Sequence, residues 1–136
     1  MYEHLTKIRV RYAETDQMGV VYYGNYAQYF EVGRAESIRE LGFTYKKIEE
    51  TGIKMPVVHM EVDYLRPAFY DELLTIKTLL KELSDNHVIH FYQEVYNESD
   101  KLITKGEVTL YFIDQHTGKK TSMPQDLRRA LAVFFR

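Results

Sequence analysis

The stretch "ETDQMGVVYYGNY", residues 14–26, joins a segment with strand periodicity to a segment with helical periodicity. Within it, Asp16 is followed by a glycine, an apolar patch and three tyrosines. The first N–H groups of a helix lack acceptors inside the helix, and they favour negative charge nearby. The question is why a carboxylate stands a few residues ahead of a helix start, with aromatic groups between them. The secondary structure on either side decides where the two groups lie.

A long amphipathic helix is predicted directly after this stretch, over residues 24–41. At 100° per residue, one apolar arc collects Tyr26, Tyr29, Phe30, Gly33, Ser37 and Leu41. Gly33 and Ser37 lie in the middle of that arc. Such small side chains predict a close approach to the packing partner, although glycine costs about 1 kcal/mol of helix propensity. Gly42 is typical of the residue that ends a helix.

The rest of the chain has mostly the pattern of β-strands. Ile8, Val10 and Tyr12 alternate with basic residues and predict a half-buried strand over residues 7–12. Four later runs rich in β-branched and aromatic residues predict strands over residues 58–64, 73–83, 87–96 and 102–113. The turns between the later strands are short, so the sheet should be antiparallel. Pro124, with Ser122 as a cap, predicts a short final helix.

This order of elements predicts an α+β fold in a single domain over residues 1–136. One long helix cannot cover both faces of a five-stranded sheet. Its wide apolar arc favours a curved antiparallel sheet that wraps around it, with the short C-terminal helix added at the end. The consecutive strands also leave an open sheet edge, which natural proteins usually pair or cover. We therefore expect two copies to pair edge to edge as a homodimer.

Composition excludes several classes of function. The chain has 136 residues and no cysteine, which removes disulfides, thiolate nucleophiles and cysteine metal sites. A net charge of -2 provides no basic footprint for nucleic acid. No apolar run is long enough for a membrane span, and the first ten residues lack the apolar stretch of a signal peptide. These features favour a soluble domain in the cytoplasm.

Two segments of the chain carry a resemblance to a known family. The first reads "Y-x-E-T-D-x-x-G-V-V-Y" from Tyr12, followed by "N-Y" and a helix with "F-E-x-x-R-x-E". The second reads "Y-x-x-P-A-x-Y-D-E" from Tyr64. Together, with the order of elements, they resemble the hotdog-fold acyl-CoA thioesterases of the 4-hydroxybenzoyl-CoA thioesterase type. The resemblance extends over essentially the whole chain.

The resemblance implies a central helix wrapped by an antiparallel sheet, in dimers that often form tetramers. It implies hydrolysis of acyl-CoA without a metal or a bound cofactor. It assigns the catalytic carboxylate to Asp16, as general base or nucleophile, and the N–H that polarises the thioester carbonyl to Tyr23. It assigns a pocket-lining acid to Glu31. The chemistry of the residues is consistent with this, because N–H groups at a helix start can hold the charge that develops on an attacked carbonyl.

The sequence leaves several alternatives open. Asp16 could be only a turn residue. Glu31 could pair with Arg34 three positions later on the helix, and we expect that pair in preference to a pocket role. The family's hydroxybenzoyl enzymes carry tyrosine at the position of Tyr23 but aspartate at that of Glu31, whereas many other relatives carry histidine at the position of Tyr23. This mixture leaves the acyl group open. Hydrolysis of acyl carrier protein thioesters and a non-catalytic acyl-binding or CoA-binding module are the alternative functions.

Overall fold

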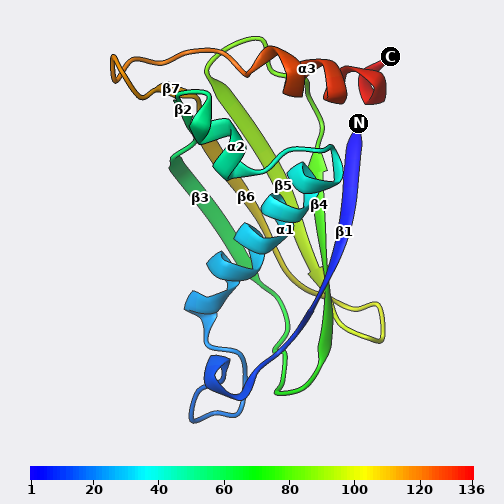
Figure 1. Cartoon of the computed structure of the whole chain (residues 1–136). Helices are drawn as coiled ribbons and strands as arrows, with labels where there is room; N and C mark the ends of the chain where they lie inside the picture. Colours follow the sequence, from blue (N-terminus) through cyan, green and yellow to red (C-terminus); the bar gives the residue numbers. More distant parts are fainter.

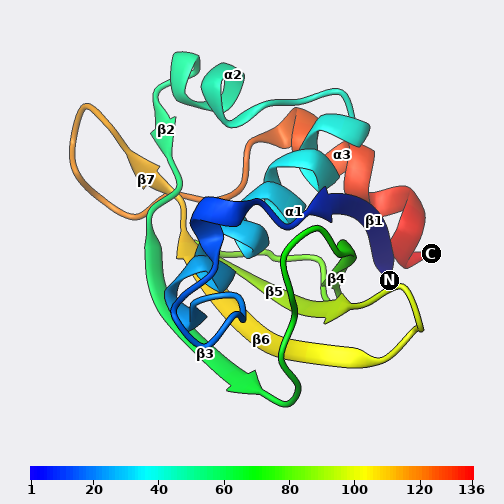
Figure 2. The same cartoon turned by 90° about the horizontal axis from the view of Figure 1, so that it is seen from below.

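The computed structural model describes all 136 residues. A five-stranded sheet curls around one long helix, α1 (Tyr26–Glu40) (Figure 1, Figure 2). The strands lie in the order β1 (Tyr2–Arg9), β4 (Leu73–Leu80), β5 (Val88–Tyr96), β6 (Leu102–Tyr111) and β3 (Val57–Tyr64), and every pair is antiparallel. The predicted fold class is therefore confirmed.

Small side chains allow α1 to lie close to the sheet. A Cβ atom on Gly33 would lie 2.7 Å from Ile76 Cγ2 and 2.7 Å from Thr78 Oγ1, both on β4. One turn earlier, the ring of Phe30 covers Gly106 of β6, where a Cβ would lie 2.7 Å from the ring. The predicted close approach is confirmed. Gly42, with a φ of +94°, follows the C-terminus of the helix as expected.

Two short helices and a second, two-stranded sheet complete the fold. Strands β2 (Ile53–Lys54) and β7 (Ile113–Asp114) pair beside α2 (Tyr45–Glu50). Helix α3 (Gln125–Ala132) and a final 3-10 turn, η3 (Val133–Phe135), end the chain beside its N-terminus, where the amino group of Met1 donates to Phe134 O. No helix in the structure has both the length and the apolar character needed to cross a membrane.

The structure corrects several predicted boundaries. The first strand spans Tyr2–Arg9 instead of residues 7–12, because Tyr12 lies in a 3-10 turn, η1 (Tyr12–Glu14), and is exposed. The strand predicted to reach residue 83 ends at Leu80. Ser122 does not cap the last helix: Pro124 is its N-cap residue, without a side-chain hydrogen bond. Helix α2 was not predicted, because Ile48 is its only buried residue and periodicity needs more than one.

Candidate active site

The loop between β1 and α1 lies against the loop between β3 and β4, near the N-terminal end of α1 (Figure 1). Val21 N donates to Ala68 O at 2.8 Å, and Val10 N donates to Glu72 O at 2.9 Å. Asp71 N completes the contact by donating to Val10 O at 3.0 Å. The two sequence segments that carry the family resemblance are thus joined directly by the bond from Val21 to Ala68, and Val10, just before the first segment, adds two more bonds to the second.

Asp16 lies at the tip of a small hairpin in the first of these loops. Its N–H donates to Val20 O and its carbonyl accepts from Gly19 N, both at 2.9 Å. Gly19 has a φ of +78°, a conformation that glycine adopts without steric cost. The side-chain Oδ1 accepts from Met18 N at 2.9 Å, while Oδ2 has no hydrogen-bond partner in the protein. The carboxylate is partly exposed, so one of its oxygens is free to act on a ligand or on water.

The start of the helix follows a few residues later. A 3-10 turn, η2 (Tyr23–Asn25), leads without a break into α1. Asn25 N donates to Tyr22 O, but the N–H groups of Tyr23 and Gly24, the first two of this turn, have no acceptor in the protein. Free N–H groups at a helix start form a site for negative charge. Tyr23, singled out in the sequence for its N–H group, therefore stands at a position where that group is available.

Aromatic rings surround the helix start. Tyr64 lies 5.9 Å from the ring of Tyr23 and 5.7 Å from that of Tyr26, between ring centroids. Its hydroxyl donates to Tyr23 O at 3.4 Å. These rings help to line a hollow of about 270 Å³, whose lining residues are Val20, Val21, Tyr23, Tyr26, Tyr64, Leu65, Arg66 and Pro67. The pKa of Tyr22 is raised, chiefly by the neighbouring Tyr23 phenol and to a smaller extent by the negative charge of Asp16.

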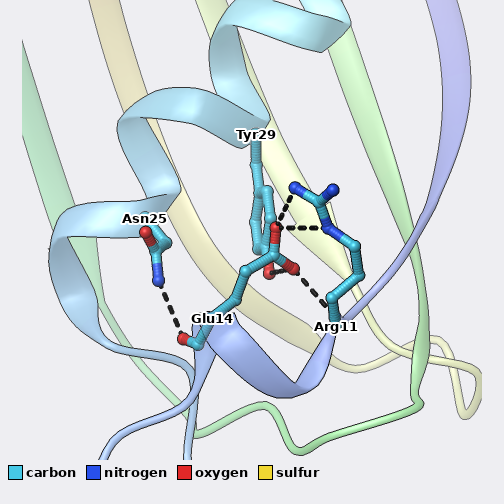
Figure 3. A network of polar contacts seen from close by, with 4 residues as sticks. All are labelled: Arg11, Glu14, Asn25 and Tyr29. Atoms are coloured by element: carbon cyan, nitrogen blue, oxygen red, sulfur yellow. Dashed lines mark hydrogen bonds and ion pairs between the residues drawn. The ribbon is translucent and has the colours of Figure 1, made fainter.

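The buried carboxylate of Glu14, two residues before Asp16 in the sequence, was not identified from the sequence. Glu14 is 7% exposed, and its carboxylate accepts from Tyr29 Oη at 2.9 Å and from Arg11 N at 2.8 Å (Figure 3). Arg11 adds two further hydrogen bonds from its guanidinium, at 3.0 and 3.2 Å. In the sequence, Glu14 reads as one polar residue of a turn and Tyr29 as a core residue. The contact between Glu14 and Tyr29 arises from tertiary packing, which the sequence pattern does not reveal.

The environment of Glu14 shifts two pKa values in opposite directions. Burial acts to raise the pKa of Glu14, but hydrogen bonds from Arg11 and Tyr29 outweigh it, and the pKa is lowered. Burial raises the pKa of Tyr29, and its hydrogen bond to the Glu14 carboxylate raises it further. At neutral pH the pair is thus an ionised carboxylate and a neutral phenol that donates to it.

The expected ion pair between Glu31 and Arg34 is absent, so this prediction is wrong. No nitrogen of Arg34 lies within 4.0 Å of a carboxylate oxygen; its Nη1 donates instead to Gln93 Oε1 at 3.1 Å. The arginine is 6% exposed because Gly33 draws this part of the helix onto the sheet, whereas Glu31 is exposed. Burial lowers the pKa of Arg34, and the nearby Tyr45 and Glu31 oppose that shift.

A second hollow, of about 240 Å³, lies between α1, α2 and the sheet. Glu31 and Arg34 both line it, together with Tyr45, Ile48, Glu49, Ile53, Met55, Val57 and Leu110. Arg34 Nε and Tyr45 Oη are buried here without a hydrogen-bond partner. Glu31 therefore lines a largely apolar hollow while it stays exposed to solvent, and it forms no ion pair with Arg34. No group of three or more His, Asp or Glu side chains has the arrangement of a metal site.

Comparison with known proteins identifies the family of the chain. The sequence profile of the Thioesterase-like superfamily matches residues 10–131. YneP of Bacillus subtilis, provisionally classed as an acyl-CoA thioesterase, is 36% identical over 118 residues, which is 85% of each chain. The acyl-CoA thioester hydrolase YbgC of Escherichia coli O157:H7 is 28% identical over 120 residues, 88% of this chain and 89% of its own.

A solved structure extends the likeness to three dimensions. The DHNA-CoA thioesterase of Staphylococcus aureus superimposes with a TM-score of 0.91 at 37% identity, over 99% of this chain and 92% of its own. The resemblance found in the sequence is therefore confirmed by the profile, by relatives that match most of the chain, and by the shared architecture. The protein belongs to the Thioesterase-like superfamily and is a hotdog-fold thioesterase.

Proposed function

We propose that the protein hydrolyses the thioester of an acyl-CoA to a free acid and CoA. The observation that carries this proposal is that two features lie at the same end of the molecule. One is the Asp16 carboxylate, whose Oδ2 has no hydrogen-bond partner, and the other is the helix start, where the N–H groups of Tyr23 and Gly24 are free. Relatives named as acyl-CoA thioesterases support the choice of CoA.

The proposed mechanism needs one carboxylate and one helix start. The N–H of Tyr23 polarises the thioester carbonyl and then holds the oxyanion that forms on attack. In the general-base route, Asp16 takes a proton from water, whose oxygen adds to the carbonyl carbon. In the nucleophilic route, Asp16 itself adds, and water hydrolyses the resulting anhydride. In both routes the C–S bond breaks on collapse of the tetrahedral intermediate, and the thiolate of CoA leaves.

Glu31 points to the class of acyl group. An unpaired carboxylate that lines a hollow would have to lose water to accommodate a long alkyl chain, at a cost of several kcal/mol. We therefore propose that an aromatic or short polar acyl group is preferred, and that Glu31 contacts it. A Glu31–Arg34 pair would have satisfied both charges locally and would have favoured medium or long alkyl chains instead. The name of the Staphylococcus aureus structural relative, a DHNA-CoA thioesterase, also supports a preference for an aromatic acyl group.

The proposal includes a homo-oligomer that is closed at strand β3. In this edge strand, Val57, Met60 and Tyr64 are 50, 42 and 50% exposed. Their partners on β6, Leu110, Val108 and Thr104, are buried, so these three residues lie on the side that faces α1. Helix α1 packs mainly on β1, β4 and β5. It covers this side of β3 only in part, through contacts such as that between Tyr26 and Tyr64. Apolar side chains beside an unpaired strand edge fit a second copy of the chain. A cytoplasmic location remains a prediction.

A panel of acyl thioesters tests the proposal. Release of thiol is followed with a thiol reagent for acetyl- to palmitoyl-CoA, for hydroxybenzoyl-type aromatic CoA esters, and for the same acyl groups on acyl carrier protein. The proposal predicts turnover of CoA esters, with the highest kcat/KM for an aromatic or short polar acyl group. Faster turnover on the carrier protein would replace CoA with that partner, and binding without turnover would identify a non-catalytic module.

The variant Glu31→Gln tests the acyl preference within the same panel. Removal of the charge should raise kcat/KM for long alkyl chains, since each buried methylene contributes about 0.8 kcal/mol once the carboxylate no longer has to be desolvated. Glu36→Gln, which removes a half-buried carboxylate of the same helix that pairs with Arg39 and lines neither hollow, is the control. An unchanged acyl profile in Glu31→Gln would refute contact between Glu31 and the acyl group.

A further inference from the structure

The Glu14 carboxylate connects the loop that carries Asp16 to the body of α1. On the helix side, it accepts from the hydroxyl of Tyr29, a residue that is 2% exposed in the centre of the core (Figure 3). On the loop side, it accepts from the backbone and the guanidinium of Arg11. All four hydrogen bonds involve an ionised group, which makes them stronger than neutral ones.

The backbone of Glu14 makes a second connection, to the start of the helix. Its carbonyl accepts from Asn25 Nδ2 at 2.8 Å and from Tyr22 N at 2.9 Å. Tyr22 directly precedes Tyr23, whose N–H group is one of the two that are free. One residue is therefore tied to both the first turn and the second turn of the helical segment, through its main chain and its side chain.

Asp16 is two residues from this point. Thr15, between them, pairs with Val21, so the hairpin that carries Asp16 begins where the Glu14 contacts end. We propose that Glu14 is a positioning residue, which holds the Asp16 carboxylate at a fixed place relative to the N–H groups of the helix start, with Tyr29 and Asn25 as its partners on the helix. This inference rests on the proposed function and assigns Glu14 no contact with the substrate.

Tyr2 provides a matched comparison. It too is a buried tyrosine, 3% exposed, and its hydroxyl donates to Ser37 O in α1 at 2.7 Å. It anchors β1 to the C-terminal half of the helix, away from Asp16. Loss of either hydroxyl removes one buried hydrogen bond between α1 and the rest of the protein. Only the loss at Tyr29 should disturb the geometry of the site.

The experiment compares Tyr29→Phe with Tyr2→Phe on the most active acyl-CoA found in the panel. Both variants should lower Tm by similar amounts. Tyr29→Phe should lower kcat about tenfold to a hundredfold, the scale of a misplacement of reacting groups by about 1 Å, and leave KM within about twofold. Tyr2→Phe should leave kcat unchanged. Asn25→Ala, which removes the tie to the Glu14 carbonyl, should behave like Tyr29→Phe and provides the test if that variant does not fold.

A double variant separates positioning from stability. If Glu14 and Tyr29 act through Asp16, then Tyr29→Phe should have little further effect on the residual rate of Asp16→Asn, because groups that act as a unit are not additive. Additive losses, or a kcat in both Tyr29→Phe and Asn25→Ala equal to that of Tyr2→Phe, would overturn the positioning role while leaving the proposed function intact. Full activity of Asp16→Asn itself would instead overturn the proposed function.

Discussion

At the scale of single residues, the Glu14 carboxylate makes the stability of the fold depend on pH. Its pKa is lowered in the folded protein, below the ordinary value of about 4.3 for glutamate. A group with a lowered folded pKa contributes stability that is fully present above its unfolded pKa and is lost as pH falls through its folded pKa. The contribution is therefore present at neutral pH and disappears in acid.

Glu14→Gln removes this titration. At pH 7 the substitution should lower the free energy of unfolding by about 1–3 kcal/mol, because the buried Tyr29 hydroxyl and the N–H groups of Arg11 lose their ionised acceptor. Below about pH 4 the difference between the two proteins should shrink, since the wild-type carboxylate is then becoming protonated. Urea unfolding at a series of pH values measures both. A difference that stays constant down to pH 3 would show that the charge of Glu14 contributes no stability.

The residues of the site differ in how far the sequence could predict them. Asp16 and Tyr23 stand in a motif whose order and spacing are local, and the structure places both near one end of α1. The Glu31–Arg34 pair was wrong because three-residue spacing says nothing about which of the two side chains the sheet will bury. Glu14 was missed since its partner, Tyr29, is brought to it only by tertiary packing.

At the scale of elements, the contact between α1 and β4 depends on the absence of a side chain at Gly33. In an exposed helix, Gly→Ala would stabilise by about 1 kcal/mol. Here the new Cβ would meet Ile76 and Thr78 at 2.7 Å, and overpacking of this kind costs about 1–3 kcal/mol. Gly33→Ala should therefore destabilise the protein, and the midpoint of its urea unfolding should lie at a lower urea concentration than that of the wild type. Gln28→Ala, on the exposed face of the same helix, is the control and should shift the midpoint little. A higher midpoint for Gly33→Ala would show that the sheet moves to accept the methyl group.

Elements with a strong period were predicted, and elements without one were not. In helix α1 and in strands β4, β5 and β6, the apolar residues recur with the same period as the buried positions, because each element has one covered face. Strand β1 was placed too late in the sequence. Its inward side carries His4 and Thr6 as well as Tyr2 and Ile8, and two polar residues on that side hide the alternation. No property of residues 2–6 alone distinguishes them from a polar terminus.

At the scale of the whole molecule, the exposed apolar residues of edge strand β3 predict self-association. Light scattering should give about 32 kDa for a dimer or about 64 kDa for a tetramer, twice or four times the chain mass of 16.2 kDa. Met60→Glu places a charge among the exposed apolar residues of β3 and should shift the mass toward the monomer. Leu5→Glu, at a 58% exposed position on the opposite edge strand β1, should not. A wild-type monomer at micromolar concentration would contradict the edge-pairing proposal.

The central claim is that Asp16 performs the chemical step of thioester hydrolysis. The most direct measurement is kcat/KM for the preferred acyl-CoA in Asp16→Asn beside Asp114→Asn. Asp114 also caps a turn through Oδ1, accepting from His116 N at 2.8 Å, but lies in β7, away from α1. Both substitutions keep that acceptor oxygen. Asp16→Asn should lower kcat/KM by at least about a hundredfold, the scale of a positioned acid–base group, while Asp114→Asn should retain the wild-type value. Equal activities in two well-folded variants would contradict the claim.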